Sequence, residues 1–417
     1  MQQIKAEVLT IGDEILYGQI LDTNTQWMST RLDAAGIRVV RRSTIGDNRE
    51  DILKALADAE NRADIVLITG GLGPTSDDLT KPCLAAYFGV PLKMHEEALQ
   101  HITDLFTRRG REMTPLNMAQ AELPANCTML MNENGSAPGM WFDERGTVFI
   151  SMPGVPFEMK AIMKNEVMPR LRERFELPVI YHKLIRTAGI GESWLADKIK
   201  DWEDNLPPHI RLAYLPSLGM VRLRLTATGT SRTHLESDVQ EQADKVMPLI
   251  EKYVYGYDEI SLEEAVGNML REAGKTLATA ESCSGGYLAH QITRVPGSSD
   301  YFQGSIISYS NTVKMASLEV DEETLKTHGA VSEPVVKQMA EGARKKMGTD
   351  YALATSGVAG PGGGTDEKPV GTIWIACADS KGTIAKKLQL TTDRIVNIQY
   401  TAVAALNMLR LRMSGND

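Results

Sequence analysis

The sequence predicts a mixed α/β protein of three domains. Candidate strands and helices alternate over the first 170 residues, a smaller region with polar alternation follows, and buried strands alternate with helices again after residue 258. A chain of 417 residues is also too long for one ordinary hydrophobic core. We therefore place the domains at residues 1–170, 171–257 and 258–417.

The composition is ordinary for a globular protein, with 42% hydrophobic and 24% charged residues. A net charge of −9 disfavours a general nucleic-acid binder. The four cysteines lie far apart without paired spacing, which argues against a zinc knuckle and a disulfide framework. The chain starts like a strand rather than a signal peptide, and no apolar run reaches membrane-spanning length. We expect a reduced, cytoplasmic protein that does not enter a membrane.

The first domain alternates strands at residues 6–11, 37–43 and 64–69 with helices at residues 24–35 and 49–59. This order predicts a parallel sheet covered on both faces. Ligands of such sheets bind at the carboxyl ends of the strands.

Two of these strand ends carry glycines and carboxylates, at residues 12–16 (GDEIL) and 70–78 (GGLGPTSDD). Glycines let backbone amides approach a phosphate, and Asp13, Asp77 and Asp78 could hold a hard divalent ion that bridges phosphate oxygens. The same residues could form only a tight turn and a helix cap. Because two such loops follow successive strands, we favour ligand binding. The loops at residues 132–140 and 152–159, taken alone, are equally well explained as turns.

Together, residues 12–16, 22–24, 70–78, 135–139 and 153–159 resemble the amino-terminal domain of the competence/damage-inducible protein A (CinA) family. That domain is similar in fold to the molybdopterin-binding proteins. The resemblance implies a metal-dependent ADP-ribose pyrophosphatase. Binding of ADP-ribose is carried over to Asp13, Asn24, Gly71, Thr75 and Glu158. Asp77 and Asp78 are the candidate metal ligands, with the identity of the divalent ion left open.

The middle segment combines strands at residues 180–187 and 221–228 with helices at residues 194–202 and 235–253. This small α+β unit resembles the KH-like middle domain of the CinA family. Its arginines 211, 222 and 224 raise the question of RNA binding. However, alternating arginines usually form a solvated face, and the segment lacks the Gly-x-x-Gly clamp of a KH motif. We expect a spacer that also forms a homodimer, and we do not expect nucleic acid as a partner.

The third domain contains the loop at residues 279–286 (TAESCSGG), between a buried strand at 275–278 and a helix at 287–292. Such a turn leaves free backbone N–H groups and a positive helix end, which suits an anion or an oxyanion. Alternatively, Ser282 and Ser284 only cap the helix.

Two further strand ends supply partners for this loop. The strand at 304–308 leads to Tyr309 and Lys314, and the strand at 350–354 leads to a glycine-rich loop at 355–364. A lysine whose pKa is lowered by burial can activate a serine, and a tyrosine can relay or steady the proton. Cys283 is a rival nucleophile, but no histidine lies close in sequence to activate it.

Residues 281–286, 309–314 and 356–361 stand in the order of the carboxyl-terminal module of the CinA family, which also occurs as a free-standing nicotinamide mononucleotide (NMN) deamidase. The resemblance implies hydrolysis of NMN to nicotinate mononucleotide and ammonia without a cofactor. It assigns Ser282 as nucleophile, Lys314 as base and Tyr309 as its partner. Nucleotide binding is carried over to Ser284, Gly285, Gly286, Ser356, Gly360, Gly363 and Arg394. At Ser284 and Ser356 the family often has threonine, so the hydroxyl is kept.

The sequence therefore predicts a hydrolase of pyridine-nucleotide recycling with two active domains. One alternative is a nucleic-acid-associated competence or damage factor whose nucleotide pockets only regulate it. Another is a first domain that binds nucleotide without turnover.

Overall fold

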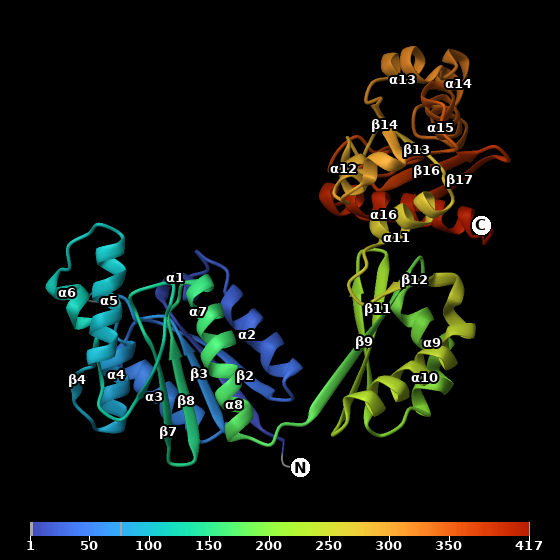
Figure 1. Ribbon diagram of the computed structural model, residues 1–417. Coiled ribbons are helices and arrows are strands. Elements are labelled where there is room, and N and C mark those ends of the chain that lie inside the picture. Colours follow the sequence, from blue (N-terminus) through green and yellow to red (C-terminus); the bar gives the residue numbers. More distant parts are fainter. Residues whose placement is uncertain (1–2, 76, 417) are drawn as a thin grey trace. The chain divides into compact units, whose positions relative to one another are not determined.

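The computed structural model describes residues 3–75 and 77–416, so Ser76 of the predicted loop at 70–78 lies outside the described residues. The chain divides into two compact units, one formed by residues up to Tyr181 with Thr228–Leu235, the other by His182–Ala227 and the chain from Glu236 onward. Both contain helices and sheets, as Figure 1 shows, which confirms the predicted mixed α/β class.

The first unit is built on a six-stranded sheet with the order β2-β1-β3-β8-β7-β6. Its parallel strands are β1 (Lys5–Ile11), β2 (Arg38–Ile45), β3 (Ile65–Thr69) and β8 (Thr147–Met152). β7 (Gly139–Glu144) pairs antiparallel with β8 on one side and with β6 (Thr128–Leu130) on the other. The predicted strands are confirmed, and their carboxyl ends gather at one edge of the sheet.

Helices cover both faces of this sheet. Because successive side chains of each strand point to opposite faces, each strand contributes to two buried clusters. In β1, Ala6 and Val8 belong to one buried cluster, while Leu9 and Ile11 belong to the other. The first cluster includes residues of α2 (Thr23–Ala34), α7 (Pro156–Ile162), the π-helix Met163–Val167 and α8 (Met168–Arg174); the second includes residues of α3 (Arg49–Glu60) and α4 (Thr80–Phe88). The smaller elements are α1 (Asp13–Leu16), β4 (Leu92–Met94), α5 (Glu96–Arg108), α6 (Pro115–Ala119) and β5 (Glu122–Pro124).

The middle region has a four-stranded antiparallel sheet with the order β10-β11-β9-β12. Its elements are β9 (Val179–Ala188), α9 (Glu192–Asp204), β10 (Ile210–Ser217), β11 (Met220–Gly229), α10 (Arg232–Ile250), a short 3-10 helix Glu251–Tyr253 and β12 (Val254–Tyr257). In β11, Leu223 and Leu225 are buried, whereas Arg222 and Arg224 alternate with them and are only partly buried. The predicted strand at residues 221–228 is confirmed, whereas Arg222 and Arg224 are less exposed than the expected solvated face.

The carboxyl-terminal module has a five-stranded sheet with the order β14-β13-β15-β16-β17. The strands are β13 (Leu277–Glu281), β14 (Phe302–Ile307), β15 (Tyr351–Gly357), β16 (Thr372–Asp379) and β17 (Gly382–Gln389). β13 pairs in parallel with β14 and β15, whereas β16 pairs antiparallel with β15 and β17. The helices are α11 (Leu262–Glu272), α12 (Tyr287–Thr293), a 3-10 turn Ser298–Asp300, α13 (Asn311–Leu318), α14 (Glu322–His328), α15 (Glu333–Met347) and α16 (Arg394–Met413).

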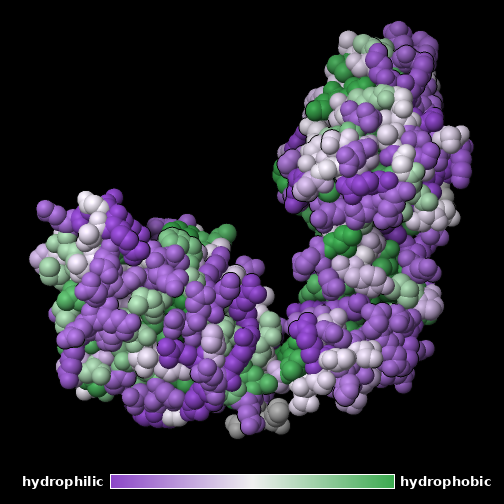
Figure 2. Space-filling model, in the orientation of Figure 1, coloured by the Kyte–Doolittle hydropathy of each residue, from purple (hydrophilic) through white to green (hydrophobic). Residues whose placement is uncertain are grey.

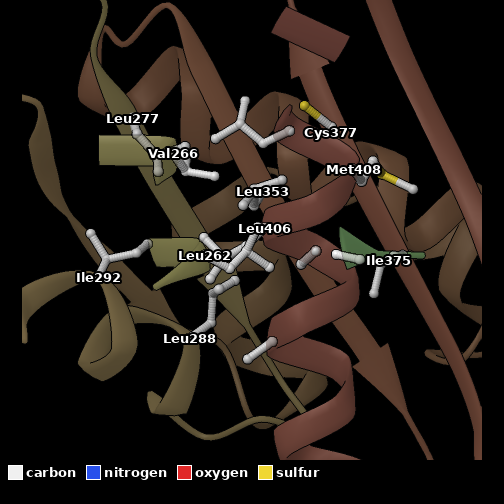
Figure 3. Close-up of a cluster of buried hydrophobic side chains, with 14 of the residues drawn as sticks. Leu262, Val266, Leu277, Leu288, Ile292, Leu353, Ile375, Cys377, Leu406 and Met408 are labelled. Carbon is white, nitrogen blue, oxygen red and sulfur yellow. The ribbon is translucent and has the colours of Figure 1, made fainter. Parts of the chain in front are cut away.

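The two faces of this sheet carry side chains of different size. Figure 3 shows the larger ones, where Leu353 and Ile375 of the sheet meet Leu262, Leu288 and Leu406 of α11, α12 and α16. On the opposite face, the fully buried side chains of β13, β15 and β16 are alanines: Ala278, Ala280, Ala352, Ala354, Ala376 and Ala378. The partly buried Ile306 and Trp374 also pack against this cluster. Small side chains let α15 lie close to the sheet.

The surface of both units is mainly polar on the face that Figure 2 shows, with small apolar areas between. Within residues 3–75 and 77–416, no helix has the length and apolar character needed to cross a membrane.

Candidate active site

Ser282 begins the loop that follows β13, and it is held against the neighbouring strand. Its N–H donates to the carbonyl oxygen of Thr355 in β15 at 3.0 Å. The loop then turns through Gly285 and Gly286, whose φ angles of 61° and 100° lie in the left-handed region that favours glycine. The predicted strand at residues 275–278 is too short, because β13 continues through Glu281.

Lys314 of α13 lies beside this serine. Its Nζ is 3.0 Å from the Ser282 Oγ and donates to the carbonyl oxygen of Ser308 at 2.7 Å. The side chain is only 1% exposed, and burial lowers the pKa of the amine, although the nearby Cys283 opposes this shift. A neutral amine can accept the serine proton across the same contact, so the predicted nucleophile and base are brought together.

Cys283 is buried beside the pair. Burial raises the pKa of its thiol to about 12. The thiol is therefore protonated near neutral pH and is a poor nucleophile. This favours Ser282 over its neighbour on electrostatic grounds.

The N–H groups at the start of α12 are not free, contrary to the expectation from the sequence. Those of Gly286, Leu288 and Ala289 all donate to the carboxylate of Glu281, at 2.9, 3.1 and 2.8 Å. The predicted anion site at this helix end is thus filled by the chain's own carboxylate. In the described part of the chain, the N–H groups of Cys283 and Ser284 donate to no oxygen, and these two are the candidates for an oxyanion site.

Tyr309 is placed differently from Lys314. Its side chain is 63% exposed, and its hydroxyl accepts a hydrogen bond from Arg394 Nη2 at 3.1 Å. Arg394 also donates to the carbonyl oxygen of Gly360 at 2.8 Å. The tyrosine side chain therefore joins the glycine-rich loop rather than the proton-transfer pair, and only its main-chain oxygen lies 3.4 Å from Lys314 Nζ.

The predicted nucleotide-binding serines have internal hydrogen bonds. The Ser284 hydroxyl lies 2.7 Å from both Glu281 Oε2 and Thr355 Oγ1, and the Ser356 hydroxyl donates to the carbonyl oxygen of Ala330 at 2.7 Å. Both serines therefore support their loops, and direct contact with a nucleotide stays a prediction for them. Gly363 lies in the same glycine-rich loop as Gly360, with a φ angle of 84°.

The first unit has a cavity of about 540 Å³ at the carboxyl ends of β1, β3 and β8. Of the predicted residues, those in its lining are Asn24, Gly71, Asp77, Asp78 and Glu158. Asp13 and Thr75 are not in the lining: Asp13 donates its N–H to Asp47 Oδ2 at 3.1 Å, and Thr75 donates its N–H to Asp78 Oδ2 at 3.0 Å. Among the described residues, the buried Asn24 Oδ1 has no hydrogen-bond partner, so the cavity contains an acceptor for a ligand donor.

The lining also includes Asp47 and Gln120, which lie outside the loops quoted from the sequence, and Glu14 of the quoted loop at residues 12–16. Burial raises the pKa of Asp47, and the negative charges of Asp13, Glu14 and Asp77 act in the same direction. The sequence does contain a signal for Asp47, because this residue follows β2 and the carboxyl ends of parallel strands meet at one edge of the sheet.

The described residues could coordinate a divalent ion in this cavity only together with oxygen atoms of a bound substrate. The described residues form no group of three or more metal-ligating side chains. Mg²⁺ is nevertheless commonly held by one or two carboxylates together with substrate phosphates. Asp77 and Asp78, which both line the cavity, provide that smaller donor set.

Comparisons with known proteins agree with this architecture. Residues 259–413 match the CinA C-terminal domain, residues 182–256 the damage-inducible protein CinA KH domain, and residues 7–173 the family described as "Probable molybdopterin binding domain". A CinA-like protein of Cytophaga hutchinsonii is 52% identical over 410 residues, which cover 98% of each chain. The chain belongs to the CinA family.

Two further proteins are similar to this chain. A CinA-like protein of Flavobacterium psychrophilum is 44% identical over 97% of this chain and 98% of its own. The crystal structure of a competence/damage inducible protein from Agrobacterium tumefaciens is 35% identical and covers 37% of this chain and 93% of that one, with a TM-score of 0.36. The predicted fold class, with a molybdopterin-binding-like first domain and a KH-like middle domain, is confirmed by the family matches.

Proposed function

We propose that this CinA-family chain hydrolyses the carboxamide of NMN to nicotinate mononucleotide and ammonia, as part of pyridine-nucleotide recycling. The observation that carries the reaction type is the buried Lys314 Nζ at 3.0 Å from Ser282 Oγ. The family resemblance of the three loops supports the substrate.

The reaction would start when Ser282 Oγ attacks the carboxamide carbon and its proton moves to the neutral Lys314 amine. The carbonyl oxygen gains the negative charge, which the N–H groups of Cys283 and Ser284 would stabilise. When the tetrahedral adduct collapses, Lys314 returns the proton to the departing nitrogen, ammonia leaves, and an ester on Ser282 remains. Water then attacks this ester with Lys314 as base, releasing the carboxylic acid and restoring the serine.

Nucleotide binding would use the group formed by Tyr309, Gly360 and Arg394. Arg394 is the cation of this group, and it already contacts the other two residues. A guanidinium at this place can pair with the phosphate of NMN.

The test is to measure ammonia and nicotinate mononucleotide released from NMN by the full chain. We expect the two products in equal amounts, a Ser282→Ala variant without activity, and a Cys283→Ala variant within about tenfold of the parent. Loss of activity in the cysteine variant with retention in the serine variant would make Cys283 the nucleophile.

We also propose that the first domain is a metal-dependent ADP-ribose pyrophosphatase. Its support is the cavity of about 540 Å³ with adjacent carboxylates at Asp77 and Asp78. A bound divalent ion would supply charge neutralisation at the diphosphate oxygens. The chain's own part is to orient the substrate with Asn24 and Glu158 and to offer a carboxylate as base. Binding without turnover is the alternative, and release of AMP from ADP-ribose that stops on chelation of metal would exclude it.

We further propose a cytoplasmic homodimer that does not depend on nucleic acid. A competence or damage factor that binds DNA or RNA through charge would lose its binding steeply as salt is added. Absence of binding at low salt would remove that alternative.

A further inference from the structure

Glu281, the last residue of β13, is a fully buried carboxylate that the proposed reaction does not use. Its side chain is 0% exposed, yet it makes no ion pair in the described part of the chain. Its two oxygens instead accept five hydrogen bonds, from the N–H groups of Gly286, Leu288 and Ala289 and from the hydroxyls of Ser284 and Ser305.

A buried carboxylate is costly unless hydrogen bonds and favourable dipoles replace its hydration. Here the replacement comes from the start of α12, where unpaired N–H groups and the positive end of the helix dipole favour a negative charge. Hydrogen bonds to an ionised acceptor are also stronger than those between neutral groups. One side chain therefore ties the end of β13 to the first turn of α12.

Only residues 282–285 lie between these two tied points, and the nucleophile is the first of them. The N–H of Ser282 is fixed separately to the Thr355 oxygen of β15. With both ends of so short a loop fixed, Ser282 Oγ has little freedom to leave Lys314 Nζ, 3.0 Å away. The carboxylate also occupies the helix N–H groups, which leaves those of Cys283 and Ser284 as the donors beside the nucleophile.

We propose that Glu281 is the positioning residue of the serine loop: it sets the place of Ser282 against Lys314 and directs the substrate's developing charge to the N–H groups of Cys283 and Ser284. This inference rests on the proposed serine–lysine chemistry and deepens it. Glu281 acts through the loop and touches no reacting atom.

The test is the rate constant with which a fluorophosphonate probe modifies Ser282 in the full chain, followed by mass spectrometry. This probe reports an activated serine whatever the natural substrate is. We compare the parent with Glu281→Gln, which keeps the shape but replaces one accepting oxygen by an NH₂ group that cannot accept. Glu264→Gln is the matched control, because Glu264 also accepts a main-chain N–H at a helix start, that of Ser261 at 2.8 Å, but in α11.

We expect Glu281→Gln to lower the rate constant by about 100-fold, since a misplacement of about 1 Å can cost that much. The control should stay within about twofold of the parent. A purely structural role would reduce the fraction of protein that reacts, not the rate constant of the folded fraction. If Glu281→Gln does not fold, Ser284→Ala removes one donor to the carboxylate and should lower the rate constant by about tenfold.

An unchanged rate constant in the folded Glu281→Gln protein would overturn the inference, as would a parent chain whose Ser282 does not react. Reaction of the parent with the probe but no ammonia from NMN would instead contradict the proposed substrate and leave the role of Glu281 standing.

Discussion

At the scale of single residues, the pKa of Lys314 decides when the site can work. Burial lowers this pKa, so the neutral base appears at a lower pH than for an exposed lysine. We expect kcat/KM for NMN to rise with pH through the lowered pKa and then to level off. A profile measured with the folded parent chain checks this, and a rate that falls over the same range would contradict a lysine base.

The same shift predicts how stability depends on pH. Because the folded chain holds the Lys314 proton less tightly than the unfolded chain, the free energy of unfolding should increase with pH between the folded and the unfolded pKa. Below the folded pKa the full cost of burying the charge remains. A Lys314→Met variant should lose this dependence and be more stable at neutral pH by on the order of 1 kcal/mol. Urea denaturation at several pH values measures both effects, and equal stability at all pH values in the parent would contradict the account.

Cys283 gives a third prediction at this scale. Since burial raises the pKa of its thiol to about 12, it should react with iodoacetamide far more slowly than a free cysteine at pH 8. Peptide mapping after timed alkylation measures this. Rapid, selective labelling of Cys283 would show that the loop is more open than the structure has it.

The role of a residue could be predicted from the sequence where its partners lie nearby, and not where they lie far along the chain. Ser282 and Lys314 are found because each follows a recognisable strand, Ser282 directly after β13 and Lys314 in the helix after β14. The role of Glu281 was missed, since its partners become donors only when α12 folds back onto it. The contact of Tyr309 with Arg394 joins residues 85 positions apart, and no local pattern indicates it.

At the scale of elements, the close packing of α15 against α13 leaves no room for a side chain at Gly342. A Cβ added there would lie 2.0 Å from the carbonyl oxygen of Leu318, at the end of α13. Gly342→Ala should therefore destabilise the module by about 1–3 kcal/mol, although alanine is the better helix former by about 1 kcal/mol. Thermal unfolding measures this, with the exposed Glu341→Ala as control, expected within about 0.5 kcal/mol of the parent. A stabilised Gly342→Ala would contradict the packing.

Central strands such as β3 and β8 could be predicted from continuous apolar runs, because both faces of the sheet are covered there. The residues at which strands end are harder to predict. The sequence suggests an end at Ala278, since the polar Thr279 and Glu281 follow, yet β13 keeps both residues buried and extends through Glu281. Hydrogen bonds from outside the strand make the burial of Glu281 possible, and a local pattern cannot show them. The buried Thr279 hydroxyl has no hydrogen-bond partner among the described residues.

At the scale of the whole molecule, the two candidate sites lie in different compact units. We therefore expect their activities to separate. Asp77→Asn should lower turnover of ADP-ribose by at least about tenfold and leave the rate of ammonia release from NMN within about twofold. A metal chelator should act in the same selective way. Assays of both reactions on one preparation measure this, and a parallel loss of the two activities would indicate one coupled site.

The central claim is that Ser282 and Lys314 act as one catalytic unit, and a double-mutant cycle of ammonia release from NMN tests it most directly. Residues that act together lose their effect together. We predict that Ser282→Ala and Lys314→Ala each lower kcat by about a thousandfold or more in folded protein, and that the double variant is no worse than either. Losses that simply add, or a Lys314→Ala variant that keeps the parent rate, would contradict the serine–lysine mechanism.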